Sequence, residues 1–130
     1  MNKILLILFL TLSFNCFSQS QTEMNKEAGS EYNKAENEMN RIYQQILTEY
    51  KMDDVFVENL KKSQRIWIEF RDAELEMKYP KRERSYYGNT LPLCNAIYLK
   101  KLTDKRTKTL KIWLIGIEEG DNCNGSVKTN

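Results

Sequence analysis

The segment from Leu60 to Glu74, LKKSQRIWIEFRDAE, decides the fold. Steps of four, three and four place four of its residues on one helical face: Leu60, Gln64, Trp67 and Arg71. The leucine and the tryptophan predict that this face is buried. A buried glutamine and a buried arginine need partners, because an unpaired buried charge costs several kcal/mol. The segment therefore predicts a helix that packs against its neighbours through side chains that are partly polar.

Two further segments carry a helical pattern. Residues 20–50 repeat apolar positions at alternating steps of four and three, and residues 91–115 form a third amphipathic stretch. The capping-box form of Ser20–Glu23 predicts that the first helix begins there. In the second helix we expect an aspartate cap at Asp53 or Asp54, a buried stripe that includes Phe70, and an end before Pro80. The fold class is therefore predicted to be all-α: an antiparallel bundle of three long amphipathic helices.

The first 18 residues are predicted to be a signal peptide. Lys3 precedes an apolar run, Ile4 to Phe14, that is shorter than the about 20 residues needed to span a bilayer. Cleavage is expected after Ser18; a transmembrane anchor and a lipoprotein attached through Cys16 are the alternatives. The expected organisation is a signal peptide at 1–18, a helical domain at 19–117 and a polar tail at 118–130, disordered from Asp121 to Asn130 apart from Cys123. The mature chain is then periplasmic or secreted.

Two cysteines remain after this cleavage, Cys94 and Cys123. An oxidising compartment favours a disulfide between them. A straight helix over residues 91–115 would be about 37 Å long, however, and would hold them apart unless the tail folds back. An intramolecular bond, free thiols and an intermolecular bond all stay open, and so does the oligomeric state.

Composition argues against several classes of function. The chain of 130 residues contains no histidine, and its five glycines are scattered. This removes the commonest general base, most zinc sites and the glycine-rich phosphate loops. We therefore expect no enzyme activity, no cofactor and no metal. A formal net charge of +2 gives no reason to expect nucleic acid as a partner.

Polar residues on the helix faces predict a polar seam between the helices. We expect these side chains to form hydrogen bonds that fix the register of the bundle. The alternative is that the same groups reach a binding partner. The expected members of the seam are Asn40, Gln64, Trp67, Arg71, Asp72, Thr103 and Arg106.

The order of these motifs resembles a known family. Three blocks stand in sequence, Glu38-Met39-Asn40-x-x-Tyr43, then Gln64 through Glu74, then Leu102-Thr103-x-x-Arg106. This series is similar to the LprI-like domains, exported bacterial proteins named for a lysozyme inhibitor, over about residues 22–112. The resemblance implies a small helical domain of the cell envelope that binds a protein. The usual cysteines of the family would fall at Glu27, Leu75 and Tyr98, so the cross-link that they imply is absent here.

The resemblance further implies that the chain occludes lysozyme stoichiometrically. A loop tip suits a concave cleft, so we expect contact through the loop after the second helix, at Arg82, Arg84, Tyr86, Tyr87 and Asn89. A glutamate face on the first helix, formed by Glu23, Glu27 and Glu31, is the competing contact surface. The alternative function is an exported structural or assembly domain that binds another envelope protein and does not inhibit lysozyme.

Overall fold

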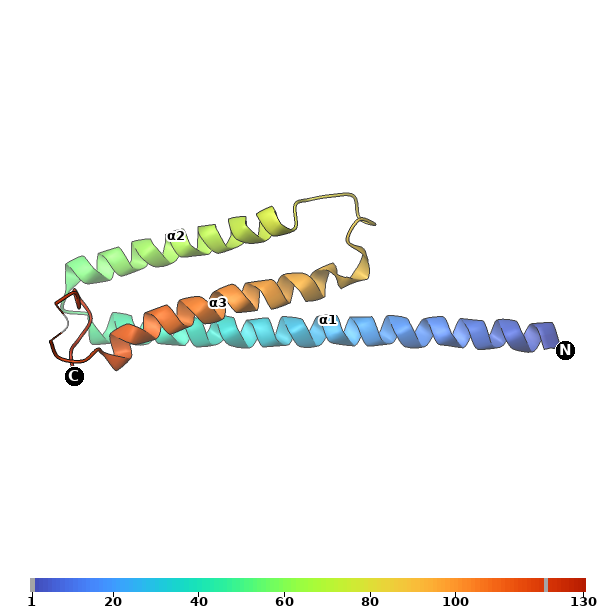
Figure 1. Cartoon of the computed structure of the whole chain (residues 1–130), viewed down its shortest axis with the longest axis horizontal. Helices are drawn as coiled ribbons and strands as arrows, with labels where there is room; N and C mark the ends of the chain where they lie inside the picture. Colours follow the sequence, from blue (N-terminus) through green and yellow to red (C-terminus); the bar gives the residue numbers. More distant parts are fainter. Residues whose placement is uncertain (1, 121) are drawn as a thin grey trace.

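Three long helices form the molecule (Figure 1). The computed structural model describes residues 2–120 and 122–130, and side chains from residue 20 onward. The helices are α1 (Asn2–Glu49), α2 (Asp54–Lys78) and α3 (Leu91–Ile115), and a 3-10 turn, η1 (Gly88–Thr90), precedes α3. α2 runs antiparallel to α1 and α3 (Figure 1). The all-α prediction is confirmed: the described residues contain an isolated bridge between Ile117 and Thr129 and no strand.

The first helix begins earlier than the sequence predicts. α1 is continuous from Asn2, so Ser20–Glu23 lies inside the helix and does not cap it. The reason is local: neither proline nor glycine interrupts the sequence before Gly29, and an existing helix propagates through good helix formers. The predicted signal peptide lies outside the residues whose side chains are described, and it stays a prediction. Within the described part, no helix has the length and apolar character to cross a membrane.

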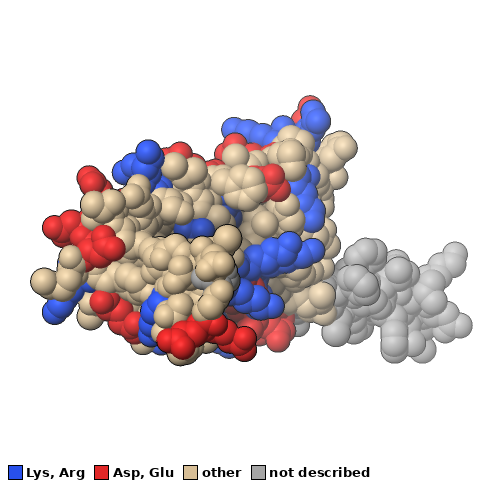
Figure 2. Space-filling view, turned by 60° about the vertical axis from the view of Figure 1, so that its left-hand side comes forward, with Lys and Arg blue, Asp and Glu red and all other residues tan. Residues whose placement is uncertain are grey.

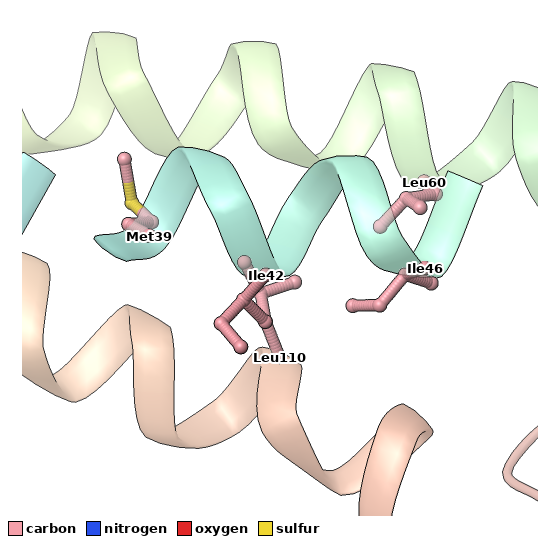
Figure 3. Packing of buried hydrophobic residues seen from close by; sticks show 5 residues of the cluster. All are labelled: Met39, Ile42, Ile46, Leu60 and Leu110. Atoms are coloured by element: carbon pink, nitrogen blue, oxygen red, sulfur yellow. The ribbon is translucent and has the colours of Figure 1, made fainter. Parts of the chain in front are cut away.

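α1 and α3 pack closely along one another. Met39, Ile42 and Ile46 of α1 meet Leu110 of α3, and Leu60 of α2 closes the cluster (Figure 3). Further along the same two helices the buried residues are small: Ala35, Ala96, Thr103 and Thr107. Small side chains let two helix backbones approach, so these helices form the densest part of the fold.

α2 is attached in a different way. Its buried side chains are Leu60, Gln64 and Arg71, and Figure 1 shows its axis set apart from α1 and α3. Asp53 caps it, accepting a hydrogen bond from the backbone N–H of Phe56 at 2.9 Å, and it ends before Pro80, as predicted. Phe70, which the sequence places in the buried stripe, is exposed. Two of the three buried side chains of α2 are therefore long and polar.

The end of the bundle near Pro80 is held by tyrosines. The Tyr98 hydroxyl of α3 donates to Glu74 of α2 at 3.1 Å, and the Lys78 ammonium lies 3.9 Å from the centroid of the Tyr98 ring. Tyr79 packs edge-on against both Tyr87 and Tyr98. Two of the cysteine positions implied by the family resemblance, residues 75 and 98, lie at this end, where non-covalent contacts join α2 to α3.

The tail beyond α3 is ordered by specific contacts, contrary to the expected disorder. Gly116 ends α3 with φ +85°, and a Cβ atom there would lie 2.5 Å from the Asn130 side chain. The Asn130 side chain donates to the Ile115 carbonyl at 2.7 Å, and the Trp113 indole donates to Ser126 at 3.0 Å. The tail therefore folds over the last turns of α3.

No disulfide joins Cys94 to Cys123. Cys94 lies in the first turns of α3, whereas Cys123 belongs to the tail beyond the other end of that helix. Because the tail folds back only over the last turns, the length of α3 keeps the two sulfur atoms apart. The two thiols are not bonded to each other in this structure, and the three alternatives left open by the sequence stay predictions.

Candidate functional site

The polar seam centres on Trp67 of α2. The guanidinium carbon of Arg71 lies 5.6 Å from the centroid of the indole ring, and that of Arg106 of α3 lies 5.9 Å from it. Both distances are in the range of cation–π attraction. A half-buried tryptophan thus separates two positive charges and interacts favourably with each.

Arg71 connects α2 to α1. Its Nη1 atom donates to Glu36 at 3.1 Å, and its Nε atom donates to Asp72 at 2.8 Å. The Tyr32 hydroxyl donates to the same oxygen of Glu36 at 3.1 Å. Burial, together with the charge of Glu36, raises the pKa of Tyr32 to about 12, so this hydroxyl stays protonated at neutral pH. The buried arginine is therefore neutralised by two carboxylates that water still reaches.

Arg106 connects α3 to α2 through neutral groups. Its Nε atom donates to Gln64 at 3.0 Å, and its Nη2 atom donates to the Ser63 hydroxyl at 3.0 Å. The Gln64 amide in turn donates to the sulfur of Met39 on α1 at 3.5 Å. Burial lowers the pKa of Arg106 from its ordinary value. Gln64 is thus in contact with both other helices.

Two expected members of the seam lie elsewhere. Asn40 is exposed on α1, because it lies about 100° around the helix from the buried Met39. Thr103 is fully buried, but its hydroxyl has no hydrogen-bond partner in the described structure. It fills space between the helices and is not part of the network.

Three residues that the sequence did not single out complete the seam: Tyr32, Glu36 and Ser63. Tyr32 and Glu36 are four apart, a spacing that places them side by side on α1. That spacing predicts contact between the two side chains. Nothing in the sequence alone indicates that they face Arg71.

The basic loop, residues 80–90, forms the second feature. Its large aromatic side chain Tyr86 is 69% exposed. The Arg82 guanidinium lies 6.0 Å from the Tyr86 ring, and the Tyr87 ring lies edge-on to it at 4.8 Å. The Tyr87 hydroxyl donates to the Pro80 carbonyl at 2.9 Å. The exposed tyrosine is therefore supported on two sides by its own loop.

The basic loop is also fastened to α1. The Asn25 amide donates to the Asn89 carbonyl at 3.0 Å, and Gln21 donates to the Asn25 side chain at 2.9 Å. A pocket of about 570 Å³ lies between the loop and α1. Four of the five expected contact residues line it, Arg82, Arg84, Tyr87 and Asn89. Tyr86 stands outside it.

The competing glutamate face of α1 is not purely acidic. Glu23, Glu27 and Glu31 surround a shallow depression together with Lys26 and Lys34. Lys34 binds Glu31 at 2.7 Å, and this hydrogen bond lowers the pKa of Glu31. On the face of the molecule that Figure 2 shows, acidic and basic side chains are interspersed. Among the described side chains of α1, the region around Glu23, Glu27 and Glu31 is therefore mixed in charge.

Within the described residues, no three histidine, cysteine, aspartate or glutamate side chains gather in a way that could hold a metal ion. The arrangement offers instead a rigid set of cations and tyrosines at one end of a bundle. Such groups bind carboxylates and ring faces.

Comparison with known proteins agrees with the motif order. The model of the family described as "Lysozyme inhibitor LprI" matches residues 16–110. An uncharacterized protein of Rhizobium meliloti (strain 1021) is 31% identical over 103 residues, which cover 71% of this chain and 72% of that relative. No solved structure matches. The matched residues contain the whole polar seam and the basic loop, and the chain belongs to the LprI lysozyme inhibitor family.

Proposed function

We propose that this protein is an exported inhibitor of lysozyme that occludes the enzyme's cleft with its basic loop. The observation that carries the proposal is the exposed Tyr86, which Arg82 and Tyr87 support at the end of the bundle. Membership of the family supports the activity, and the geometry of the loop supports the contact surface.

The chemistry of the target suits this loop. Glycosidases such as lysozyme hold two carboxyl groups in the cleft that cleaves the sugar chain. An arginine guanidinium binds a carboxylate through paired hydrogen bonds, and a tyrosine ring covers the flat faces on which sugars lie. In this proposal Arg82 or Arg84 reaches the carboxylates, and Tyr86 fills an adjacent sugar subsite. No bond is made or broken, so the protein acts as a stoichiometric ligand and not as an enzyme.

A supported loop binds with less loss of entropy than a free one. The contacts of Tyr87 with Pro80 and of Asn25 with Asn89 fix both ends of the basic loop before it meets a partner. Pre-organisation of this kind strengthens binding because fewer side chains and backbone angles are ordered on contact. The residues that reach the partner are then few and lie together.

A lysis assay on bacterial cell walls tests the proposal. Lysozymes of the chicken, goose and invertebrate types are each titrated with the protein, purified after any processing by the expressing cell. We expect inhibition of at least one enzyme that saturates near one inhibitor per enzyme. No inhibition of any of the three at micromolar excess would refute the proposal.

Matched charge reversals test the contact surface. We expect the Arg82→Glu/Arg84→Glu variant to lose about tenfold or more in affinity, since like charges then meet in the cleft. The control, Lys105→Glu/Lys108→Glu, changes the net charge equally on exposed positions of α3 and should inhibit as the wild type does. Equal inhibition by both variants would place the contact outside the basic loop.

A further inference from the structure

α2 carries an apolar stripe on the side that does not form the polar seam. Its members follow one another at steps of four, three and four: Ile66, Phe70, Ala73 and Met77. Ile66 is 51% exposed, Phe70 is 52% exposed and Met77 is 69% exposed. The buried residues of α2 point toward α1 and α3, so no described part of the chain covers the apolar stripe. A row of half-exposed large side chains on one helix is typical of a helix that packs against another.

Charged residues beside the apolar stripe are divided along the helix. Lys62 and Arg65 flank the N-terminal half of the stripe, and Glu69 and Glu76 flank its C-terminal half. These four are exposed, and none of them forms an ion pair within the described residues. Two more exposed acids share the flank: Glu58 lies one turn before Lys62, and Asp72 is bound to Arg71. Beside the stripe itself, the free positive charges therefore precede the free negative ones.

We propose that α2 pairs antiparallel with α2 of a second copy of this chain, around a twofold axis. The division of charge selects this arrangement: an antiparallel partner presents its acidic half to the basic half, whereas a parallel partner would bring like charges together. With the stripes centred on one another, Ile66 faces Met77 of the second copy and Phe70 faces its Ala73. Arg65 then lies near Glu76 of the second copy. The symmetry repeats each contact, so every favourable pair occurs twice.

The arrangement leaves the basic loop accessible. The loop follows the C-terminal end of α2, so antiparallel pairing places the two loops of a dimer at opposite ends. The dimer and the proposed contact with lysozyme therefore use separate surfaces, so an experiment can refute one proposal without refuting the other.

Sedimentation equilibrium tests the dimer. The protein is purified after any processing by the expressing cell, and mass spectrometry of the intact protein identifies its N-terminal residue. Reductant is present so that cysteines do not cross-link copies. We expect a reversible dimer, and the Phe70→Glu variant should be monomeric with an unchanged helical circular dichroism spectrum. A wild-type chain that stays monomeric up to roughly 100 µM would overturn the proposal, as would a dimer that Phe70→Glu leaves intact.

Charge reversals test the antiparallel register. Arg65→Glu and Glu76→Arg should each weaken the dimer about tenfold or more, because like charges then face each other twice. An equimolar mixture of the two variants should form a heterodimer, and the double variant should regain the wild-type association, since both restore opposite charges. Lys105→Glu on α3 is the control and should not change association. Failure of both the mixture and the double variant to recover would overturn the register.

Discussion

The interface between α1 and α3 is largely apolar, whereas the interface between α2 and the other helices is largely polar. Met39, Ile42, Ile46 and Leu110 meet between α1 and α3, where the remaining buried residues are small. α2 is joined through Trp67 between two guanidiniums and through the amide of Gln64. One interface excludes water by close packing of apolar groups. The other depends on the direction of hydrogen bonds and on the planes of three flat groups.

The difference teaches how this small bundle fixes its topology. Apolar packing is strong and largely non-directional, so α1 and α3 could tolerate some sliding along one another. The contacts of Arg71 with Glu36 and of Arg106 with Gln64 tolerate little, because each bond requires one distance and one angle. We infer that the α1–α3 interface supplies most of the stability and that the polar seam sets the position of α2.

The largest expected effect comes from the apolar interface. Leu110→Ala should lower the free energy of unfolding by about 2–5 kcal/mol, since Leu110 is almost completely buried and the truncation leaves a cavity. The control is Ile112→Ala, two residues away on the exposed side of α3, where a change within about 0.5 kcal/mol is expected. Urea unfolding followed by circular dichroism measures both. Similar losses in the two variants would contradict the location of the core.

A smaller effect is expected in the polar seam, and it should be non-additive. Arg106→Met removes the donor to the Gln64 oxygen, and Gln64→Leu removes the acceptor of Arg106. Each single change leaves one buried polar group unsatisfied and should cost about 1–2 kcal/mol. The double variant removes both the guanidinium and the amide. Its loss in free energy of unfolding should therefore be smaller than the sum of the two single losses by about 1 kcal/mol or more. Additivity within about 0.3 kcal/mol would show that the two side chains act independently.

The sequence predicts the helices well because their signals are local. Periodic apolar positions, the Asp53 cap and Pro80 each act within a few residues, and the observed bounds of α2 and α3 agree with them. The start of α1 is missed for the same reason: a capping box is a local preference that an uninterrupted helix overrides. The tail is missed because its contacts with Trp113 and Ile115 depend on where α3 ends.

The sequence predicts which residues of α2 and α3 lie in the polar seam better than it predicts which residues contact one another there. A helical face containing Gln64, Trp67 and Arg71 can be read from spacing alone, and the matching face with Arg106 likewise. Which carboxylate meets Arg71 depends on the rotation of α1 relative to α2, and no spacing within one helix contains that information. The same limit applies to Phe70. It lies about 60° around the helix from Trp67, and in the structure it belongs to the side of α2 that does not form the polar seam.

The smallest expected effect concerns the charges at the edge of the α1–α3 interface. Glu38 accepts a hydrogen bond from Arg41 at 2.7 Å, and Lys111 of α3 approaches it to 3.0 Å. These two cations lower the pKa of Glu38 from 4.5 to about 2. A carboxyl group whose pKa is lower in the folded state stabilises the protein above the unfolded pKa. That stabilisation is lost as the pH falls from about 4.5 through about 2.

Glu38→Gln should therefore reduce the free energy of unfolding at pH 7 and have only a small residual effect near pH 2, where about half of the carboxyl groups are protonated. The Glu38 side chain is 38% exposed, so solvent screening limits the loss at pH 7 to about 1 kcal/mol or less. Urea unfolding of both proteins at pH 7, 4 and 2 measures the difference, and added salt should shrink it at pH 7. A deficit that persists unchanged at pH 2 would mean that Glu38 contributes by packing. A deficit that shrinks as the pH falls would show that Glu38 stabilises the edge of the α1–α3 interface through its charge.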